Sequence, residues 1–457
     1  MTFLSRRQML QSVSTGFGYA AFAGLSTEAS AGFQNPLSPK KPHHPPKAKR
    51  VIFLCMRGGP SHVDTFDYKP QLTKDNGKSS SFAYRGAKGR KLMESPWKFR
   101  QHGESGLPIS DLYPHLAKHA DDLCLLNGMY ADIPNHPQAY LQLHTGAFRF
   151  VRPSVGAWTL YGLGTENQDL PGFITLCPTS RVGGAQNYGS SFLPAVYQGT
   201  RIGKLGESLK PSAVSDLSHP RWSAEMQRDQ LDLIQSMNQD LLQQKQQHAE
   251  LEGVIESYEL AFRMQTALPQ LMDLSSETEK TLQKYGVDKK GTDGFGRQCL
   301  LARRFAEAGV RYIELCHANW DQHGGLKSRL GANCQATDQP IAALLSDLKQ
   351  RDMLKDTLVV WGGEFGRTPH VKKADGRDHN ATGFSFWMAG GGVQGGQRYG
   401  ATDPHGIAAV ENKTHFHDLH ATMLHLLGLD HQQLTYRYAG RDFRLTDVYG
   451  RVLQEIM

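Results

Sequence analysis

The chain has 457 residues, of which 39% are hydrophobic and 21% charged, a composition ordinary for a soluble globular protein. The formal charge is +7, but residues 1–31 carry a net +1 and residues 32–50 a net +5, which leaves about +1 for the rest. The isoelectric point therefore gives no reason to expect a nucleic-acid partner. Six cysteines occur singly without a CxxC pair, which excludes a zinc-ribbon or dithiol redox motif.

The first 31 residues have the order of a twin-arginine signal peptide. Arg6-Arg7 precedes a short, weakly apolar stretch over 13–25, and Ala29-Ser30-Ala31 forms a small-x-small cleavage site. The apolar stretch is too short and too rich in serine and glycine to anchor the chain in a bilayer. We expect export through the twin-arginine translocase, cleavage by signal peptidase before Gly32, and a periplasmic or extracellular location without a transmembrane anchor. Because this route carries folded proteins, often with a cofactor, it favours a bound metal.

Residues 32–50 combine five prolines with five basic residues and no acidic residue. Such a composition is typical of an extended, solvated linker, with contact to an anionic surface as the alternative. We therefore expect a Pro/Lys-rich linker over 32–50 ahead of a single domain over 51–457.

From residue 51 onward, short apolar runs alternate with helical patterns. The predicted buried strands are 51–56, 123–126, 173–176, 311–315, 357–361 and 384–389. Apolar residues recur at helical spacing over 341–348 and 419–427, and a stretch around 221–285, poor in glycine and proline, predicts a helical insertion packed on the sheet. This order predicts an α/β fold with a mostly parallel central sheet sandwiched by helices. Cys55 and Cys316 lie inside apolar runs and are expected as small core residues; the sequence assigns no disulfide.

The loops after these strands collect histidine and acidic side chains. The candidate metal ligands are His62, Asp64, Asp321, His323, Glu364, Asp378 and His379. Any one of them could be an ordinary turn or cap residue. Recurrence at the carboxyl ends of several strands favours a ligand site, because such sheets bind ligands there. Carboxylates with imidazoles suit zinc, manganese or iron, whereas carboxylates alone suit magnesium or calcium.

Several motifs spread over nearly all of the chain after the leader identify a family. They are Gly58–Asp67, Asn135-His136, His144-Thr145-Gly146, Arg152–Gly156, Trp320–His323, Gly363–Pro369, Gly376–His379, Ala389–Gly392 and Asp418–Asp430. Together they resemble an exported bacterial family, the domain of unknown function (DUF) 1501 family, which is grouped with the alkaline phosphatase and sulfatase superfamily. The resemblance implies that superfamily's fold and a divalent metal cofactor (zinc, manganese, calcium or magnesium).

The resemblance carries over some of the superfamily's ligands. His379 precedes a strand that ends in a glycine cluster, as a superfamily histidine does. Asp321 and His323 resemble an Asp–His pair, with one intervening residue instead of three. Glu364-Phe365 keeps a carboxylate where the superfamily has an adjacent Asp-His.

Other superfamily positions are matched less closely. His62, Asp64 or Asp67 would replace the aspartate after the first strand. The sulfatase nucleophile motif, Cys/Ser-x-Pro-x-Arg at a helix start, has only a near match in Cys177-Pro-Thr-Ser-Arg181, with the proline one place early and glycines following. Counting back from the next motif puts His136 at the nucleophile position.

Asn135, His136 and Arg367 are the catalytic candidates. Either a metal-activated water attacks the ester, its pKa lowered towards about 7, or His136 forms a covalent intermediate or acts as acid or base. Arg367 has the fork of donors that suits an anion clamp, with a surface ion pair as the alternative. The expected function is hydrolysis of sulfate or phosphate esters of a small molecule or polysaccharide. The alternative is a non-catalytic envelope or carbohydrate-binding protein that keeps the fold and a structural metal.

Overall fold

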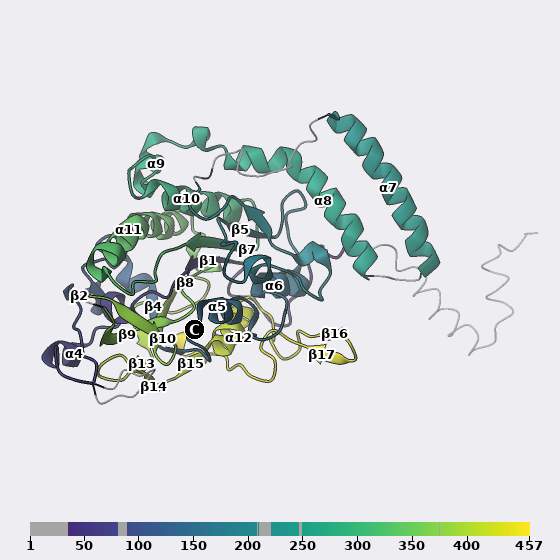
Figure 1. Cartoon of the computed structure of the whole chain (residues 1–457). Coiled ribbons are helices and arrows are strands. Elements are labelled where there is room, and N and C mark those ends of the chain that lie inside the picture. The colour runs from purple at the N-terminus through teal and green to yellow at the C-terminus, as the bar shows by residue number, and fades with distance from the viewer. Residues whose placement is uncertain (1–34, 81–88, 208, 210–220, 246–248, 374) are drawn as a thin grey trace, which may run out of the picture.

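The computed structural model describes residues 35–80, 89–207, 209, 221–245, 249–373 and 375–457, and the predicted signal peptide lies outside them. A nine-stranded sheet forms the centre of the domain (Figure 1). Its strands are β1 (Arg50–Met56), β4 (Leu123–Tyr130), β5 (Phe173–Leu176), β6 (Thr200–Ile202), β7 (Tyr312–His317), β8 (Thr357–Gly362), β11 (Phe384–Ala389), β12 (Gln397–Tyr399) and β15 (Thr414–His415). All six predicted strands are present.

The strand order is β12-β4-β11-β8-β1-β7-β5-β6, with β15 also paired to β4. Strands β8, β1, β7, β5 and β6 pair in parallel. Only β11 in this sheet is reversed, because it pairs antiparallel with both β4 and β8, while β12 and β15 run parallel to β4. The predicted mostly parallel α/β fold is therefore confirmed.

Both faces of the sheet are buried, as the continuous apolar strands predict. In β1, Ile52 and Leu54 face one hydrophobic cluster and Val51 and Phe53 the other. The first cluster includes residues of α10 (Asp293–Glu307) and α11 (Leu326–Gln350). The second includes residues of α5 (His136–Thr145), α6 (Val155–Leu163) and α12 (Phe416–Leu426). Helices thus cover the sheet from both sides.

The predicted helical insertion consists of α7 (Ala224–Lys245), α8 (Ala249–Met272) and α9 (Glu279–Tyr285). Helix α7 and the first part of α8 extend away from the sheet in Figure 1, whereas Leu268 and Met272 in the last turns of α8 are buried in the first hydrophobic cluster. α8 contacts the short 3-10 helix η4 (Ala195–Tyr197) and α10. The predicted packing therefore holds for the end of α8 and for α9, while α7 pairs with α8.

Smaller elements surround the strand ends. They are the short helices α3 (His62–Thr65) and α4 (Pro70–Lys74), the 3-10 helices η2 (Leu116–Asp122), η3 (Gly184–Asn187), η6 (Leu274–Ser276), η7 (Leu354–Asp356) and η8 (Gln454–Ile456), and the strands β2 (Phe99–His102), β3 (Leu107–Ser110), β9 (Gly366–Val371), β10 (Arg377–Asn380), β13 (Ala401–Thr402), β14 (Ala409–Glu411), β16 (Tyr436–Tyr438) and β17 (Arg441–Phe443). β9 and β10 pair with His379 opposite Arg367, so this hairpin brings two predicted site residues together.

The described part of the basic segment, residues 35–50, packs on the domain and does not extend into solvent. Leu37 and Ala48 are buried. The ammonium of Lys40 donates to the Tyr161 carbonyl at 2.8 Å and lies 3.2 Å from the Tyr197 hydroxyl, and burial lowers its pKa to about 8. Prolines and lysines predicted a solvated linker, but lysine stems can pack on apolar surface while the ammonium finds oxygen partners.

The loop after β1 touches the loop after β7 through a glycine. Gly58 has φ +120°, and a Cβ built there would lie 2.8 Å from the backbone nitrogens of Trp320 and Asp321. Only a residue without a side chain allows this approach. The two loops that carry the predicted ligands are therefore held together by backbone contact.

We expect Gly58→Ala to lower the free energy of unfolding by about 3 kcal/mol or more, because it adds both backbone strain and overpacking. Gly77→Ala is the matched control, since Gly77 also has a positive φ of +78° but a Cβ there meets nothing within 4 Å. The control should cost roughly 1–2 kcal/mol. Equal losses for the two variants in urea unfolding would contradict a close approach at Gly58.

Candidate metal centre

Predicted site residues from five segments meet beyond the carboxyl ends of the parallel strands. They are His136 at the start of α5, Asp321 and His323 in the loop between β7 and α11, Glu364 in the turn between β8 and β9, Arg367 in β9, and His379 in β10. The order β8-β1-β7 places two of these loops on either side of the loop after β1. The sheet topology therefore assembles the cluster that the sequence placed in separate loops.

The Asp321 carboxylate lies at the centre of three imidazoles. Its Oδ1 is 3.0 Å from His323 Nε2 and 3.3 Å from His379 Nε2, and its Oδ2 is 3.4 Å from His136 Nε2. The two Nε2 atoms of His323 and His379 are only 2.9 Å apart. The Asp321 side chain is 40% exposed, whereas the three imidazoles are 14–29% exposed, so the cluster opens to solvent at Asp321.

Each imidazole is oriented by a bond at its other nitrogen. His323 Nδ1 lies 3.1 Å from the Arg377 carbonyl, and His379 Nδ1 lies 2.9 Å from the Pro134 carbonyl. Because a carbonyl oxygen only accepts, both Nδ1 atoms carry the hydrogen and donate it. In the neutral imidazoles, both Nε2 lone pairs then point into the cluster, an arrangement typical of metal-ligating histidines.

Burial keeps two of these imidazoles neutral. It lowers the pKa of His323 to about 4, helped by the charge of Arg367, and it also lowers the pKa of His379. At neutral pH two lone pairs and a carboxylate oxygen therefore face one another within 3.3 Å. These lone pairs and this oxygen repel one another unless a cation lies between them. The chemistry of the group therefore fits a metal ion. In addition, His136, Asp321 and His379 each offer a ligand atom within 4.8 Å of the others.

Glu364 is a buried support for His136. Its carboxylate accepts from the Gly58 amide at 3.0 Å and from His136 Nδ1 at 2.6 Å. Burial opposes its charged form, but these hydrogen bonds lower the pKa of Glu364. The pKa of His136 is raised, because its contacts with Asp321 and Glu364 outweigh the effect of burial. Glu364 therefore orients the imidazole and does not itself face the other histidines.

Arg367 is fully buried and not a surface residue. Its Nη2 lies 2.6 Å from Asp321 Oδ1 and also donates to the Gly58 carbonyl, while Nε donates to the Gly59 carbonyl at 2.9 Å. Nη1 is buried and has no hydrogen-bond partner among the described residues. An unsatisfied buried donor is costly, so a hydrogen-bond acceptor at this atom would stabilise the site.

Asp378 adjoins the cluster but is already occupied. Its Oδ1 accepts from Lys372 at 2.8 Å, and its Oδ2 accepts from Arg90 at 3.2 Å. Burial opposes the charged form of Asp378, but these bonds lower its pKa. His323 Nδ1 is 3.8 Å from Asp378 Oδ1, and His323, Asp378 and His379 also offer ligand atoms within 4.8 Å of one another. Asp378 is therefore a neighbour of the centre whose carboxylate is already paired with Lys372 and Arg90.

The structure places His62 and Asp64 outside the cluster. His62 Nε2 lies 2.8 Å from the Gly406 carbonyl, and the His62 side chain is buried in α3. Asp64 forms a buried, two-pronged ion pair with Arg377, with Nε–Oδ2 at 2.7 Å and Nη2–Oδ1 at 2.9 Å. Their positions after the first strand suggested ligands, but Asp64 instead fixes the β10 hairpin to α3.

Two other sequence features form no hydrogen bond with the imidazoles in the described part of the chain. Asn135 is the exposed N-cap residue of α5, and its side chain makes no cap hydrogen bond. Cys177, the near match to the sulfatase nucleophile, is buried at the end of β5 with Glu207 and Gly203 as neighbours. The sequence interpretation missed Arg377, whose guanidinium and carbonyl support two site residues; its place between Gly376 and Asp378 in the motif was the available signal.

Three oriented imidazoles, a carboxylate and a buried arginine define a candidate metal centre. The model of the family described as "Protein of unknown function (DUF1501)" matches residues 48–457, so the chain belongs to the DUF1501 family. No curated protein matches the chain by sequence.

Three solved structures are similar to the chain at low identity. The PsFucS1 sulfatase from Pseudoalteromonas sp. has 13% identity and a TM-score of 0.35, with 90% of this chain and 71% of that chain covered. The phosphonate monoester hydrolase SpPMH from Silicibacter pomeroyi has 11% identity, a TM-score of 0.37 and coverages of 89% and 78%. A protein in the alkaline phosphatase superfamily from Vibrio parahaemolyticus has 10% identity, a TM-score of 0.35 and coverages of 93% and 78%. These similarities are too weak to assign a residue or an activity.

Among the described residues, no helix combines the length and apolar character needed to cross a membrane.

In the metal-free protein, Glu364→Gln should lower the pKa of His136, because it removes one of the two carboxylates that raise it. A raised histidine pKa stabilises the folded state below the unfolded value of about 6.5, and this contribution is lost as pH rises through the folded pKa. The variant should therefore lose stability mainly at acidic pH. An NMR titration of the imidazole measures the shift directly.

Asp378→Asn is the matched control, since Asp378 contacts Lys372 and Arg90 and not His136. An unchanged His136 pKa in Glu364→Gln, or an equal fall in the control, would be inconsistent with the pairing of His136 and Glu364.

Proposed function

We propose that the chain is an exported, metal-dependent hydrolase of sulfate or phosphate esters. The observation that carries the proposal is the convergence of three oriented imidazole Nε2 atoms on the Asp321 carboxylate beside a buried arginine. Hydrogen bonds alone do not explain why two neutral imidazoles have their lone pairs facing each other. A metal ion, together with an anionic substrate, accounts for both the donors and the arginine.

In this proposal His136, Asp321, His323 and His379 hold the ion. Three imidazoles and one carboxylate suit zinc or manganese better than calcium or magnesium, which prefer oxygen ligands. When bound there, the ion supplies Lewis-acid polarisation of an ester oxygen and activation of water near neutral pH. The carbonyls of Arg377 and Pro134 and the carboxylate of Glu364 accept the Nδ1 hydrogens and so orient the imidazoles, as the hydrogen-bond partners of metal-ligating histidines do.

Arg367 is proposed to bind the anionic ester. Its guanidinium is fixed by the carbonyls of Gly58 and Gly59, so little freedom is lost when a substrate oxygen binds. The unpartnered Nη1 supplies a donor beside Asp321. A buried cation at this point stabilises negative charge that develops on a sulfuryl or phosphoryl group.

His136 takes the role of a ligand oriented by Glu364, and not that of a covalent nucleophile. Its Nδ1 is held by Glu364 at 2.6 Å and its Nε2 faces Asp321 Oδ2 at 3.4 Å, so neither nitrogen is directed away from the cluster. An attacking water therefore replaces the Cys or Ser nucleophile of sulfatases in this scheme.

A cleft of about 710 Å³ has room for part of a polymeric substrate. It reaches from α3 to the start of α11, and none of its lining residues belongs to the cluster around Asp321. Its lining includes the aromatic and basic residues Tyr68, Trp97, Phe99, Lys69, Lys98 and Lys327, together with the acidic residues Glu94 and Asp375. Aromatic faces with lysines suit the sugar rings and ester groups of a charged polysaccharide. The twin-arginine leader would deliver the folded protein, through the translocase and signal peptidase, to the periplasm or the outside, where such polymers occur.

The natively exported protein should contain bound zinc or manganese and should hydrolyse an aryl sulfate or phosphate ester. Asp321→Ala and His379→Ala should lose the ion and reduce kcat/KM by at least about 1000-fold, because each removes a ligand. Metal analysis and a panel of aryl sulfate, phosphate monoester and phosphate diester substrates provide the measurements.

His102→Ala is the control, because His102 lies at the end of β2, outside the cluster. No metal and no turnover in the wild type would refute the proposal. Bound metal without turnover on any ester would instead support the non-catalytic binding protein with a structural metal.

Arg367→Lys should keep the metal but lower kcat/KM by about 100-fold or more, because lysine keeps the charge and loses the fork of donors. A variant with full activity would show that Arg367 only neutralises Asp321. Because Arg367 is buried, thermal unfolding of the variant must be compared with that of the wild type to separate misfolding from lost anion binding.

A further inference from the structure

A second group of potential ligands lies within the core, outside the cluster around Asp321. Glu314 is in the middle of β7, between Ile313 and Leu315, and is buried. Its Oε1 lies 3.0 Å from His144 Nε2 and 3.2 Å from Cys316 Sγ. No lysine or arginine forms an ion pair with it in the described part of the chain. A buried carboxylate is costly unless a proton or a cation compensates its charge.

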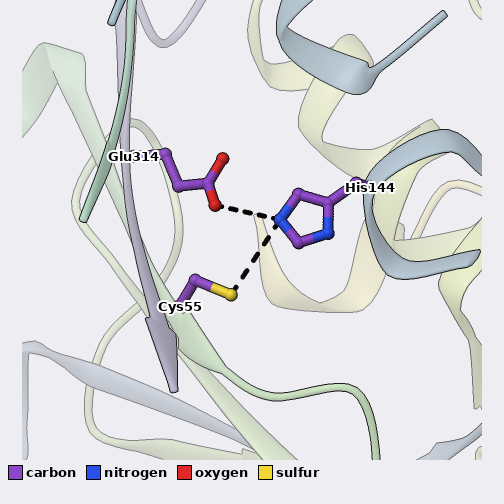
Figure 2. Close-up of side chains that lie close together, drawn as sticks. All are labelled: Cys55, His144 and Glu314. Carbon is purple, nitrogen blue, oxygen red and sulfur yellow. Dashed lines mark hydrogen bonds and ion pairs between the residues drawn. The ribbon is translucent and has the colours of Figure 1, made fainter. Parts of the chain in front are cut away.

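His144, near the end of α5, presents one nitrogen to this carboxylate. Its Nδ1 lies 2.7 Å from the Tyr140 carbonyl, so Nδ1 carries the hydrogen and donates it. Its Nε2 is directed at Glu314 and lies 3.9 Å from Cys55 Sγ, as Figure 2 shows. The imidazole is thus oriented in the same way as the three imidazoles around Asp321.

Cys55 supplies the third donor, from β1. Cys55 and Cys316 are register partners on the adjacent parallel strands β1 and β7, and all six cysteines are free and buried. Cys55, His144 and Glu314 are each 0–2% exposed, and their ligand atoms all lie within 4.8 Å of one another. This burial excludes a nucleophilic thiol that meets substrate, because no substrate reaches it.

We propose that Cys55, His144 and Glu314 hold a second divalent metal ion, zinc by its donor set, in the core between the sheet and α5. Sulfur, imidazole nitrogen and carboxylate oxygen are all zinc ligands, at about 2.0–2.3 Å from the ion. Donors at such distances from one ion are roughly 3–4 Å apart, as are the pairs His144–Glu314 and His144–Cys55. Cys316 lies next to this group, with its Sγ donating to Glu314 Oε1 at 3.2 Å.

Charge balance supports a dication at this position. Binding releases the thiol proton of Cys55 to solvent, and the thiolate and the Glu314 carboxylate together carry two negative charges, while neutral His144 adds none. A divalent ion would therefore leave this buried group without net charge.

The ion would tie α5 to the strands β1 and β7. Helix α5 begins with His136 and ends with Thr145, so one end carries a residue of the cluster around Asp321 and the other carries His144. The core ion is structural in this proposal and does not depend on the proposed hydrolysis.

The full chain, exported natively and reloaded with cobalt(II), provides the test. Thiolate coordination gives cobalt a sulfur-to-metal charge-transfer absorption band, and the residues around Asp321 include no cysteine, so the band reports only on the core site. We expect the band in the wild type, its loss on addition of excess zinc, and its retention in Asp321→Ala. That last variant separates the two sites, because it should lose the other ion alone.

Cys55→Ala should abolish the band and remove one equivalent of metal, whereas the matched variant Cys299→Ala, also at a buried free cysteine, should keep both. Absence of the band in metal-loaded wild type would overturn the proposal without reliance on any variant. A thiol count that reveals a Cys55–Cys316 disulfide, or a band that survives in Cys55→Ala, would overturn it as well.

Discussion

The candidate centre depends on the way three imidazoles are fixed at Nδ1. Two carbonyls and one buried carboxylate take the Nδ1 hydrogens of His323, His379 and His136, so each Nε2 is turned towards Asp321. Burial disfavours imidazolium at His323 and His379 and leaves lone pairs facing a negative charge. A cation among these groups would relieve their mutual repulsion, and Arg367 supplies positive charge from one side only.

The rest of the local structure serves that arrangement. Gly58 brings the loop after β1 against the loop after β7 and donates its amide to Glu364, which in turn holds His136. The β9–β10 hairpin sets His379 opposite Arg367, and the buried pair of Asp64 and Arg377 joins this hairpin to α3. The Arg377 carbonyl then accepts from His323, so the same residue supports the hairpin and an imidazole.

Much of the fold follows from local sequence pattern, and the rest depends on long-range pairing. The strands found in β1, β7 and β8 are runs of apolar residues buried on both faces, and such runs predict a parallel sheet by themselves. The reversal of β11 and the short edge strands β12 and β15 carry no such signal, because pairing partners and not propensity define them. The sequence did not predict the packing of residues 35–50, because their proline and lysine content is typical of a solvated linker.

The cluster itself could be predicted in part. In such sheets, ligand groups collect beyond the carboxyl ends of the strands. This rule was enough to predict that four residues lie together: Asp321, His323, Glu364 and His379. It failed for Asp64, because sequence does not reveal that Arg377 already satisfies its carboxylate. The core group around Glu314 had one signal, a carboxylate within an apolar strand, but its partners His144 and Cys55 are distant in sequence.

The most direct test is an anomalous-difference map from crystals of the natively exported protein, measured on both sides of the zinc and manganese absorption edges. The account predicts a peak within bonding distance of His323 Nε2, His379 Nε2 and the Asp321 carboxylate. A map without a peak, in protein shown to be folded and able to accept added metal elsewhere, would contradict a metal centre at this end of the sheet.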